Sequence, residues 1–479
     1  MSSEVVPPAA VDRPVSLREF LQIFTAVMLP MFLAAIDQTL LATATPAIAG
    51  EFGGLRDTTW IALGYLLAAT IMVPLYGRLG DRHGRARMLR LAIVVFMLGS
   101  LACGLAQSLL QLAVARVVQG LGGGGLMVMS QALIGELVRP RERPRFQGYF
   151  AANFTLASIC GPVVGGYVVA HASWRWLFLV NVPLMLFALW RVRLLPQRPL
   201  PQQRAPLGDL RGLVLFGLAV VCALVWVTFA GHRFAWSSAT SLALGAGTIA
   251  LGALLLRIER RVAAPFLPIE LLRIPGVAAM ATTVVLFASC FFACVFFLPI
   301  YVQLGTHAPA THAGLLLLPL TLGMVIGSTT TGRVTARTGR PTLMPPFGLS
   351  LSTLMLVLLG LLPPTPTVVA TLCLLCGVGF GTVMPTAQLT IQSLAGPAQL
   401  GAAAAVVSLA RSLGAVLGTA LFSAFVYSLL HGLDLDAVLH GAASDSAAVV
   451  RAFQTGFLAV AAVALCGVLV ARRLPRLQL

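Results

Sequence analysis

The chain has 479 residues, of which 58% are hydrophobic and only 10% charged, and its mean hydropathy is +0.93. A soluble chain of this length would divide into two or three domains with charged surfaces, so the composition excludes that class and indicates a membrane protein with many spans. The formal net charge of +17 comes from arginines, most of which lie in short connecting segments. Because these arginines form no single patch or stripe, a nucleic-acid partner is not expected.

Apolar runs of about 20 residues, each long enough to cross a ~30 Å hydrocarbon layer, recur along the chain. They predict an all-α, polytopic membrane protein with about fourteen transmembrane helices. The predicted helices lie near residues 20–49, 58–79, 88–106, 110–134, 147–170, 176–195, 211–230, 239–257, 275–300, 309–332, 343–362, 367–388, 398–429 and 449–471. Every second connecting segment is rich in arginine, and the positive-inside rule therefore places both termini in the cytoplasm.

The first predicted helix contains one acid, Asp37, in a segment without other charges from Leu21 to Ala49. A charged group in the bilayer costs roughly 2.5–3.5 kcal/mol on insertion scales, so Asp37 is expected to face the protein interior or a water cavity and to have a function. Because a carboxylate is neutral when buried and charged when hydrated, Asp37 is a candidate proton carrier. That role requires access to water from one side at a time, which a permanent and sealed ion pair would prevent.

Two arginines within predicted helices are candidate partners of this acid in proton coupling, Arg116 and Arg411. Arg116 and Asp37 differ in predicted depth by roughly 10 Å, part of which the long arginine side chain can bridge, directly or through water. A movement that changes their separation would change the proton affinity of Asp37. A static salt bridge that only assists assembly is the alternative. For Arg411, in the middle of the thirteenth predicted helix, the same two interpretations apply.

A nine-residue pattern occurs twice in the chain. Residues 77–85 (GRLGDRHGR) recur as residues 332–340 (GRVTARTGR), with Gly, Arg, Arg, Gly and Arg at the same offsets. Transporters are commonly built from such repeats, with the substrate site between them. The repeat predicts two six-helix bundles with two helices inserted between them. The predicted parts are residues 1–19 (cytoplasmic tail), 20–195 (first bundle), 196–210 (cytoplasmic linker), 211–257 (inserted helices), 275–471 (second bundle) and 472–479 (cytoplasmic tail).

Several motifs resemble those of the major facilitator superfamily, over nearly the whole chain. Residues 77–87 look like its signature loop between helices two and three, and residues 116–120 (RVVQG) are similar to its helix-four motif. Residues 161–166 (GPVVGG) resemble the helix-five motif that is associated with exporters.

Further residues resemble one branch of that superfamily, the 14-helix drug:proton antiporters of the EmrB/QacA type. These residues are Asp37, Thr39 and Pro46 in the first helix and the segment 174–183 (WRWLFLVNVP). Ala42 departs from the branch, which usually has Asn at this position. The resemblance implies the major facilitator fold and a location in the inner membrane of a bacterial cell.

The resemblance also implies a conformational latch at the loop after the second helix. Asp81 would face the amino end of a helix in the other half, near Ala398, and close the cytoplasmic side. The residues assigned to this latch are Gly77, Arg78, Asp81, Arg82, Gly84 and Arg85. The second copy has Ala336 in place of the acid, so the latch would be one-sided. A solvated loop that only sets topology is the alternative.

The helix-five motif combines small residues with a proline, namely Gly161, Pro162, Gly165 and Gly166. Close helix packing and a bend explain it completely, and its link to export comes from the resemblance alone. The run of glycines from Gly122 to Gly125 is either a packing surface or a flexible part of a cavity wall.

The predicted substrate cavity is apolar with a few neutral polar groups. Its candidate lining residues are Thr39, Gln119, Asn153, Phe291 and Gln388. Such a cavity favours lipophilic small molecules. We therefore expect a drug:proton antiporter that works by alternating access and takes part in multidrug efflux and antibiotic resistance. The alternative is a proton-coupled uptake symporter for a small organic solute, which would use the same scaffold.

The expected partners are a lipophilic small-molecule substrate, protons and the lipid bilayer, with a periplasmic adaptor protein as a further candidate. The predicted spans contain no Ser/His, paired-Asp or metal-ligand set, so an enzyme is not expected, nor is a metal or another cofactor. Cys373 and Cys376 have redox-motif spacing but lie in an apolar helix without a nearby His or acid, and we interpret them as packing residues.

Overall fold

Long α-helices dominate the computed structural model of the chain. The structure describes residues 17–52, 59–138, 143–195, 210–230, 234, 237–262, 267–306, 317–429, 446–475 and 477–478. Within these ranges the only β-type pairing is an isolated bridge between Ala230 and Phe234. The predicted N-terminal tail up to residue 16 and the linker 196–209 lie outside the described residues.

Each predicted helix overlaps a helix of the structure. The helices are α1 (Leu17–Phe52), α2 (Thr59–His83), α3 (Arg85–Gly104), α4 (Leu109–Leu137), α5 (Arg143–His171), α6 (Trp176–Leu179), α7 (Asn181–Arg193), α8 (Leu210–Phe229), α9 (Ala239–Glu259), α10 (Ile269–Leu272), α11 (Pro275–Thr306), α13 (Leu317–Thr338), η1 (Pro341–Leu343), α14 (Met344–Leu361), α15 (Pro366–Phe380), α16 (Val383–Ala395), η2 (Pro397–Gln399), α17 (Leu400–Leu429) and α19 (Ser446–Ala471).

Two predicted helices are each divided in two, and in both cases a proline lies in the first turn of the second part. Pro183 has no N–H to donate to the carbonyl of Leu179, where α6 ends. Pro385 likewise cannot bond the carbonyl of Gly381, which lies between α15 and α16. The sequence pattern identified the apolar runs but not these interruptions.

Eleven helical segments among the described residues are long and apolar enough to cross a membrane. They fall in α1, α2, α3, α4, α6 with α7, α9, α11, η1 with α14, α15 with α16, η2 with α17, and α19. The apolar segment Arg211–Val227 of α8 is shorter, and α5 and α13 are not among the eleven. Many spans are thus evident, whereas the predicted number of fourteen stays a prediction.

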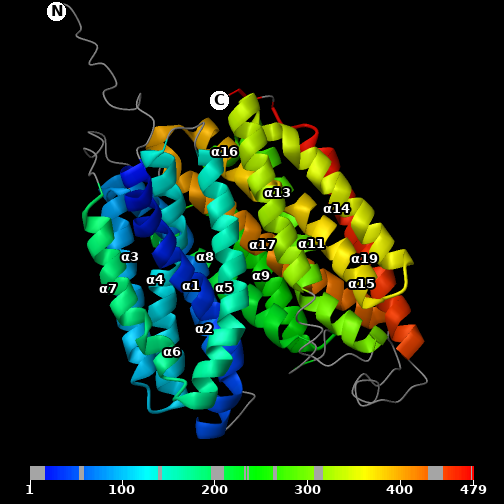
Figure 1. Ribbon diagram of the computed structural model, residues 1–479, viewed down its shortest axis with the longest axis horizontal. Helices are drawn as coiled ribbons and strands as arrows, with labels where there is room; N and C mark the ends of the chain where they lie inside the picture. Colours follow the sequence, from blue (N-terminus) through cyan, green and yellow to red (C-terminus); the bar gives the residue numbers. More distant parts are fainter. Residues whose placement is uncertain are drawn as a thin grey trace, which may run out of the picture.

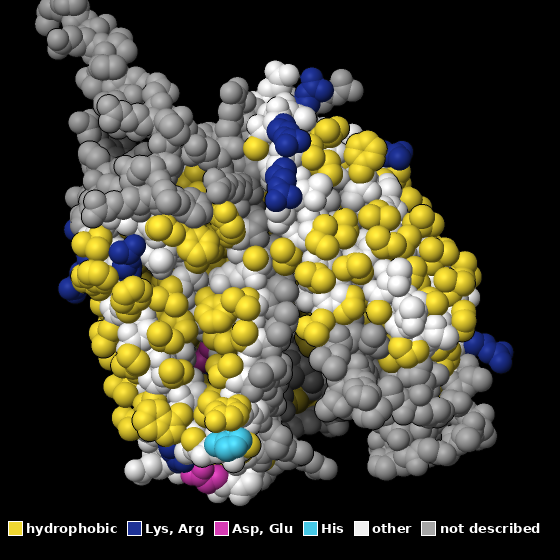
Figure 2. All heavy atoms as spheres, in the orientation of Figure 1, with side chains coloured by type: hydrophobic (Ala, Val, Ile, Leu, Met, Phe, Trp, Pro, Cys, Tyr) yellow, Lys and Arg dark blue, Asp and Glu magenta, His cyan; other side chains and the backbone are white. Residues whose placement is uncertain are grey.

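The helices form two bundles that stand side by side (Figure 1). Helices α1 to α7 make one bundle and α11 to α19 the other. We call the end at which α1 begins and α19 ends the terminal end, and the opposite one the far end. Hydrophobic side chains cover most of the described flank in Figure 2, with arginines at its edges, as expected for a surface that contacts lipid. The chain is an integral membrane protein.

The glycines of α4 allow three helices to pack closely. A Cβ atom at Gly122 would lie 2.7 Å from the carbonyl oxygen of Ala92 in α3, and one at Gly125 would lie 2.6 Å from the Tyr76 ring of α2. The glycine run is therefore a packing surface between α2 and α3.

Helices α8 and α9 form a hairpin beside the bundles. The indole N–H of Trp226 in α8 donates to the hydroxyl oxygen of Ser241 in α9 at 2.9 Å, and Gly245 packs on the same indole. The hairpin lies against α2 and, through α8, against α17. It therefore follows one of the two seams between the bundles, while α5 packs on α13 at the other.

Candidate functional site

Buried polar side chains from three other helices surround Asp37 of α1 inside the first bundle. Arg116 and Gln119 come from α4, Ser100 from α3 and Asn181 from the first turn of α7. We call these five residues the charged cluster. All five side chains are buried, so the bundle interior rather than bulk water surrounds the acid.

A direct ion pair joins Asp37 and Arg116. The Arg116 Nη1 atom lies 2.5 Å from the Asp37 Oδ2 atom, and Arg116 Nε donates to the carbonyl oxygen of Ile61 at 3.3 Å. The guanidinium also stacks over the ring of Tyr65, with 4.4 Å between its Cζ atom and the ring centroid. The arginine therefore reaches the acid without an intervening water.

The second carboxylate oxygen of Asp37 accepts hydrogen bonds from two amides. Gln119 Nε2 donates to Asp37 Oδ1 at 2.9 Å, and Asn181 Nδ2 lies 3.4 Å from the same atom. Both amides also donate to the hydroxyl oxygen of Ser100, at 3.2 and 3.0 Å. Gln119, which was expected in the substrate cavity, instead contacts the acid and its cation, because its Oε1 also accepts from Arg116 at 2.7 Å.

The cluster is sealed in this conformation. Asp37 is 2% exposed and Arg116 is 1% exposed. Asp37 thus occupies the protein interior, the first of its two expected environments, and does not face a water cavity. Asn181 was not singled out as a site residue, although it lies in the segment 174–183 that carries the resemblance to one branch.

A second polar site joins the two bundles at the terminal end. Asp81, near the end of α2, accepts hydrogen bonds from the backbone N–H groups of Gly401 at 2.9 Å and Ala402 at 3.0 Å. Both amides belong to the first turn of α17, where a carboxylate compensates unpaired N–H groups and the positive end of the helix dipole. The acid therefore meets the amino end of a helix in the other half, close to the predicted position.

Arg85 extends this contact on both sides. Its Nη2 atom lies 2.7 Å from Asp81 and donates to the carbonyl oxygen of Pro397 at 2.9 Å, while its Nη1 atom lies 2.7 Å from Glu136 in α4. One guanidinium thus connects α3 with α2, α4 and the segment before α17. This arrangement excludes the alternative of a loop exposed to solvent for Asp81 and Arg85, which are both buried.

Glycines in the loop serve separate purposes. A Cβ atom at Gly77 would lie 2.8 Å from the carbonyl oxygen of Gly401, so the close approach of α2 and α17 needs a glycine here. Gly84 has φ +92° and Gly339, its counterpart in the second copy, has φ +66°, a region that favours glycine. Both copies of the repeat therefore end a helix near a glycine with positive φ.

The remaining latch arginines lie at the edge of this site. Arg78 Nη2 lies 3.4 Å from the carbonyl oxygen of Leu267, which precedes α10. Arg82 is partly buried.

The helix-five motif packs inside the first bundle. A Cβ atom at Gly161 would lie 2.6 Å from Cβ of Thr39, whose hydroxyl donates to the carbonyl oxygen of Ala157 at 3.0 Å. Gly165 is buried, whereas nothing lies within 4 Å of a Cβ atom at Gly166. Pro162 lies within α5, but its side chain is outside the described residues. Thr39 and Gly161 thus hold α1 against α5.

The other predicted cavity residues are dispersed. Asn153 donates to the carbonyl oxygen of Met28 at 3.2 Å, and the ring of Phe291 packs against those of Phe287 and Phe380. Gln388 in α16 is buried, and neither atom of its side-chain amide has a hydrogen-bond partner among the described residues.

Arg411 reaches from α17 toward the first bundle. Its Nη2 atom lies 3.8 Å from Sδ of Met127 in α4, and among the described contacts it makes none with Asp37. The structure therefore joins one of the two predicted cations to the acid, and places the other at the interface of the bundles.

A cavity of about 610 Å³ lies beside α2, α8 and α17, and none of the five predicted cavity residues lines it. Among the described residues no group of three or more His, Cys, Asp or Glu could hold a metal ion. Cys373 and Cys376 are buried in α15 and are not bonded to each other.

An exposed ion pair is located at the far end. Arg175 contacts Glu51 through two hydrogen bonds of 2.7 and 3.0 Å, and the indole N–H of Trp174 donates to the same carboxylate at 2.7 Å. The hydrogen bonds from Arg175 and then Trp174 lower the pKa of Glu51 below its ordinary value. This contact joins the end of α1 to the segment before α6.

Sequence comparison relates the chain to known transporters. Residues 27–419 match the model of the family described as Major Facilitator Superfamily. The chain is 35% identical over 411 residues to an uncharacterised MFS-type transporter of Mycobacterium tuberculosis, a match that covers 85% of this chain and 60% of that protein. It thus spans less than two thirds of the length of that relative.

Two relatives from Bacillus subtilis have names that describe drug transport. One is the multidrug transporter protein MdtP, 30% identical over 405 residues, with 84% of this chain and 74% of that protein covered. The other is multidrug resistance protein 3, 28% identical over 400 residues, with 83% and 77% covered.

Solved structures share the fold. The human organic anion transporter MFSD10 aligns with a TM-score of 0.65 at 15% identity, over 94% of this chain and 99% of that one. The proton:xylose symporter XylE aligns with a TM-score of 0.63 at 14% identity, over 95% and 96%. At these identities the likeness concerns the arrangement of helices alone.

Proposed function

Because the chain belongs to the major facilitator superfamily and is therefore a membrane transporter, we propose that it exports lipophilic small molecules in exchange for protons. We assign it to the 14-helix drug:proton antiporter branch, in the inner membrane of a bacterial cell with both termini in the cytoplasm. Two relatives that are named for multidrug transport support the substrate class.

The proposed fourteen spans are the eleven apolar segments together with α5, α8 and α13. The hairpin of α8 and α9 fits the proposed pair of inserted helices, with residues 20–195 and 275–471 as the two six-helix bundles. The asymmetry of arginines supports a cytoplasmic terminal end. The Asp81 contact with α17 then closes the cytoplasmic side, and the structure corresponds to an outward-facing or occluded arrangement.

The ion pair of Asp37 and Arg116 is the observation that carries the proposal. Removing one partner of a buried pair costs about 3–5 kcal/mol, because the other charge is left without compensation. Protonation of Asp37 removes that charge, and it therefore lowers the cost of separating Asp37 from Arg116. A conformation in which the two are apart is favoured when Asp37 carries a proton.

The sealed position of Asp37 constrains the route of the proton. At 2% exposure the carboxylate is not open to either side in this arrangement, so proton exchange requires a second conformation that exposes it. In the proposed cycle, substrate enters from the cytoplasm or inner leaflet while Asp37 is deprotonated, and a proton from outside neutralises the acid and promotes release.

The available energy is sufficient for export. One proton that moves down 100 mV and one pH unit provides about 3.7 kcal/mol, which supports a substrate gradient of about 500-fold. The apolar character of the spans and the small number of buried acids favour substrates without several positive charges.

The decisive experiment measures proton movement in proteoliposomes. Asp37→Asn is expected to insert at the wild-type level and to show no substrate-dependent proton flux, and wild-type coupling in this variant would refute the role of Asp37. Transport into inverted vesicles separates export from a proton-coupled uptake symporter. A toxicity panel in a pump-deleted host, with wild type and Asp37→Asn, would identify the substrate class, and partners such as a periplasmic adaptor could be sought in the same host.

The pair has a simpler alternative as a static support of the bundle. If that alternative holds, the double variant Asp37→Asn/Arg116→Gln restores both stability and coupled transport. If the proposal holds, the double variant regains stability but transport stays uncoupled from protons.

A further inference from the structure

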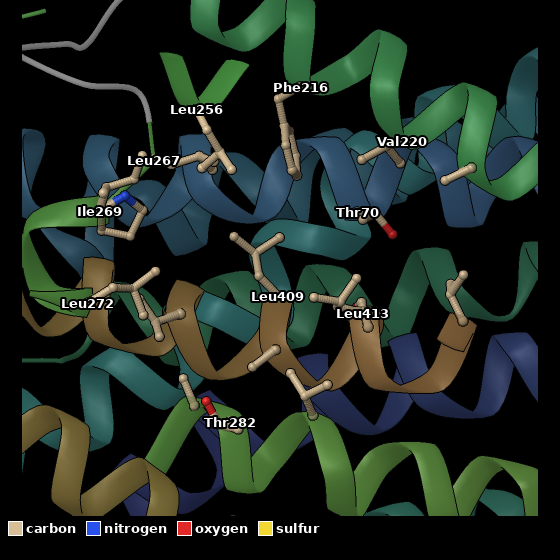
Figure 3. A pocket seen from close by; sticks show the side chains of 18 of the residues that line it. Thr70, Phe216, Val220, Leu256, Leu267, Ile269, Leu272, Thr282, Leu409 and Leu413 are labelled. Atoms are coloured by element: carbon tan, nitrogen blue, oxygen red, sulfur yellow. The ribbon is translucent and has the colours of Figure 1, made fainter. Parts of the chain in front are cut away.

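The cavity beside the hairpin is separate from the charged cluster and the Asp81 contact. It has a volume of about 610 Å³ and is enclosed by side chains of α2, α8, α9, α11 and α17, together with the segment from Leu267 to Leu272. In Figure 3, Phe216 and Leu256 face Leu409 and Leu413 across this space. We call it the flank pocket.

The lining of the flank pocket is almost entirely apolar. Of the residues that line it, only Thr70, Thr282 and Ser412 have polar side chains, and none is charged. The hydroxyl of Thr282 donates to the carbonyl oxygen of Ala278 at 2.9 Å, within its own helix. Sites for drug-like molecules usually add precisely placed polar groups that fix the orientation of the ligand. The flank pocket offers almost none, and its lining therefore suits a hydrocarbon chain.

The pocket is elongated along the helices. On α17 its lining extends from Val406 to Val416, which corresponds to ~15 Å at ~1.5 Å per residue. Because α11 and α17 begin at the terminal end, with Pro275 and Leu400, the pocket starts near that end and reaches the middle of the helices. This depth equals half of a ~30 Å hydrocarbon layer, or one leaflet.

The pocket is open to the surroundings of the protein, because several of its lining residues are exposed. Leu256 is 46% exposed, Leu272 is 42% exposed and Leu413 is 54% exposed. In an integral membrane protein, exposed leucines at this depth contact lipid chains. A chain can therefore enter from the bilayer without crossing water.

We propose that the flank pocket binds one acyl chain of a membrane lipid from the leaflet at the terminal end. The chain runs parallel to α8 and α17 and fills the space between the hairpin and the second bundle. Thr70 of α2 belongs to the first bundle, whereas the α11 and α17 residues belong to the second, so the bound chain contacts both bundles at the seam. This inference does not depend on proton coupling or on the direction of transport.

The test uses the full chain in liposomes that contain a phospholipid with a photoreactive diazirine on its acyl chain. After irradiation, adducts mapped by mass spectrometry are expected to concentrate on the lining segments 216–224, 278–285 and 406–416. Ala410→Trp fills the pocket and is expected to reduce these adducts at least fivefold, and Ala281→Trp fills it from α11. Ala462→Trp, on an exposed position of α19 outside the pocket, is the matched control and is expected to leave the map unchanged.

Two outcomes would overturn the proposal. One is a wild-type map with adducts spread evenly over all lipid-facing helices, a result that needs no variant and so does not depend on folding. The other outcome combines two results in wild type. A lipophilic drug analogue abolishes the lipid adducts, and a photoreactive form of the same analogue labels the same segments in the absence of the photoreactive lipid. Together these results would assign the pocket to a solute. Adducts lost in both filling variants but retained in Ala462→Trp would support the acyl chain.

Discussion

The carboxylate of Asp81 lies 2.9 Å from the amide nitrogen of Gly401, a residue 320 positions later in the chain. This contact places a negative charge at the amino end of α17 and joins the two bundles at one end of the molecule. Arg85 holds the carboxylate in place from α3. An acid near the end of one helix thus contacts the amino end of a helix in the other half.

We expect Asp81→Asn to weaken closure at the terminal end. Hydrogen bonds to a charged group contribute about 1.5–3 kcal/mol each, so the loss of the charge shifts the equilibrium toward the open state by tenfold or more. Electron-spin distances between labels at Arg87→Cys and Arg337→Cys, both exposed positions at this end, would measure the shift.

The repeat supplies a matched control for this prediction. Ala336→Asn introduces the same residue at the equivalent position of the second copy, where no acid is present, and is expected to leave the distances unchanged. Identical distance distributions for Asp81→Asn and wild type would show that the contact does not set the equilibrium.

Two glycines of one motif should respond differently to the same substitution. Gly161→Ala places a Cβ atom 2.6 Å from Cβ of Thr39 and is expected to cost about 1–3 kcal/mol by overpacking. Gly166→Ala meets open space and is expected to stabilise the helix by up to about 1 kcal/mol. Thermal unfolding of the two variants tests this, and equal effects would contradict the packing account.

The ion pair of Asp37 and Arg116 predicts a strongly non-additive double-mutant cycle. Arg116→Gln leaves the Asp37 carboxylate buried without its cation, at a cost of about 3–5 kcal/mol. Adding Asp37→Asn removes the isolated charge and is expected to restore most of this loss. Urea or thermal unfolding in detergent gives the free energy of unfolding of wild type, the two single variants and the double variant. If the effects of the two single substitutions simply add in the double variant, Asp37 and Arg116 do not interact directly.

Two buried glutamines of α16 predict opposite effects on stability. Gln388 has no hydrogen-bond partner among the described residues, so Gln388→Leu is expected to stabilise the protein by about 1–3 kcal/mol. Gln392 donates to the carbonyl oxygen of Gln131 in the other bundle at 3.2 Å, and Gln392→Leu is expected to destabilise it. If Gln388 contacts substrate, Gln388→Leu also reduces transport; a destabilised Gln388→Leu would show that its amide is satisfied.

The far-end contact predicts a transition in acid. Because the pKa of Glu51 is lowered in the folded protein, its stabilisation is fully present above the unfolded pKa of about 4.3 and is lost as the pH falls through the lower folded value. The fluorescence of Trp174, obtained as the difference between wild type and Trp174→Phe, should change in that range. Glu51→Gln is expected to abolish the change, and its persistence would assign it to another group.

The sequence predicted the helices because apolar runs and membrane thickness leave few alternatives for their length. The position of Asp81 against the amino end of a helix in the other half was expected only from the resemblance to the superfamily, because the repeat marks this segment but not its partner. The breaks before Pro183 and Pro385 were missed, although the sequence shows both prolines and each lacks an N–H group for a helical hydrogen bond.

The surroundings of Asp37 were only partly predictable. The predicted depths of Asp37 and Arg116 in their helices suggested that the two are partners. The contacts of the Gln119 and Asn181 amides with Asp37 depend on how α4 and α7 are rotated about their axes, and the hydrophobic periodicity of the sequence does not specify this rotation. The direction of Arg411, which contacts Met127, depends in the same way on the rotation of α17 about its axis. The flank pocket depends on the packing of six segments and could not be inferred from any one of them.

The two seams between the bundles are unequal, because the hairpin of α8 and α9 lies along α2 and α17, whereas α5 meets α13 at the front of Figure 1. A molecule that diffuses within the plane of the membrane meets the α8–α9 hairpin at one seam and the direct contact of α5 with α13 at the other. The two seams therefore differ as lateral routes between the bilayer and the protein interior, although the two bundles share a sequence repeat.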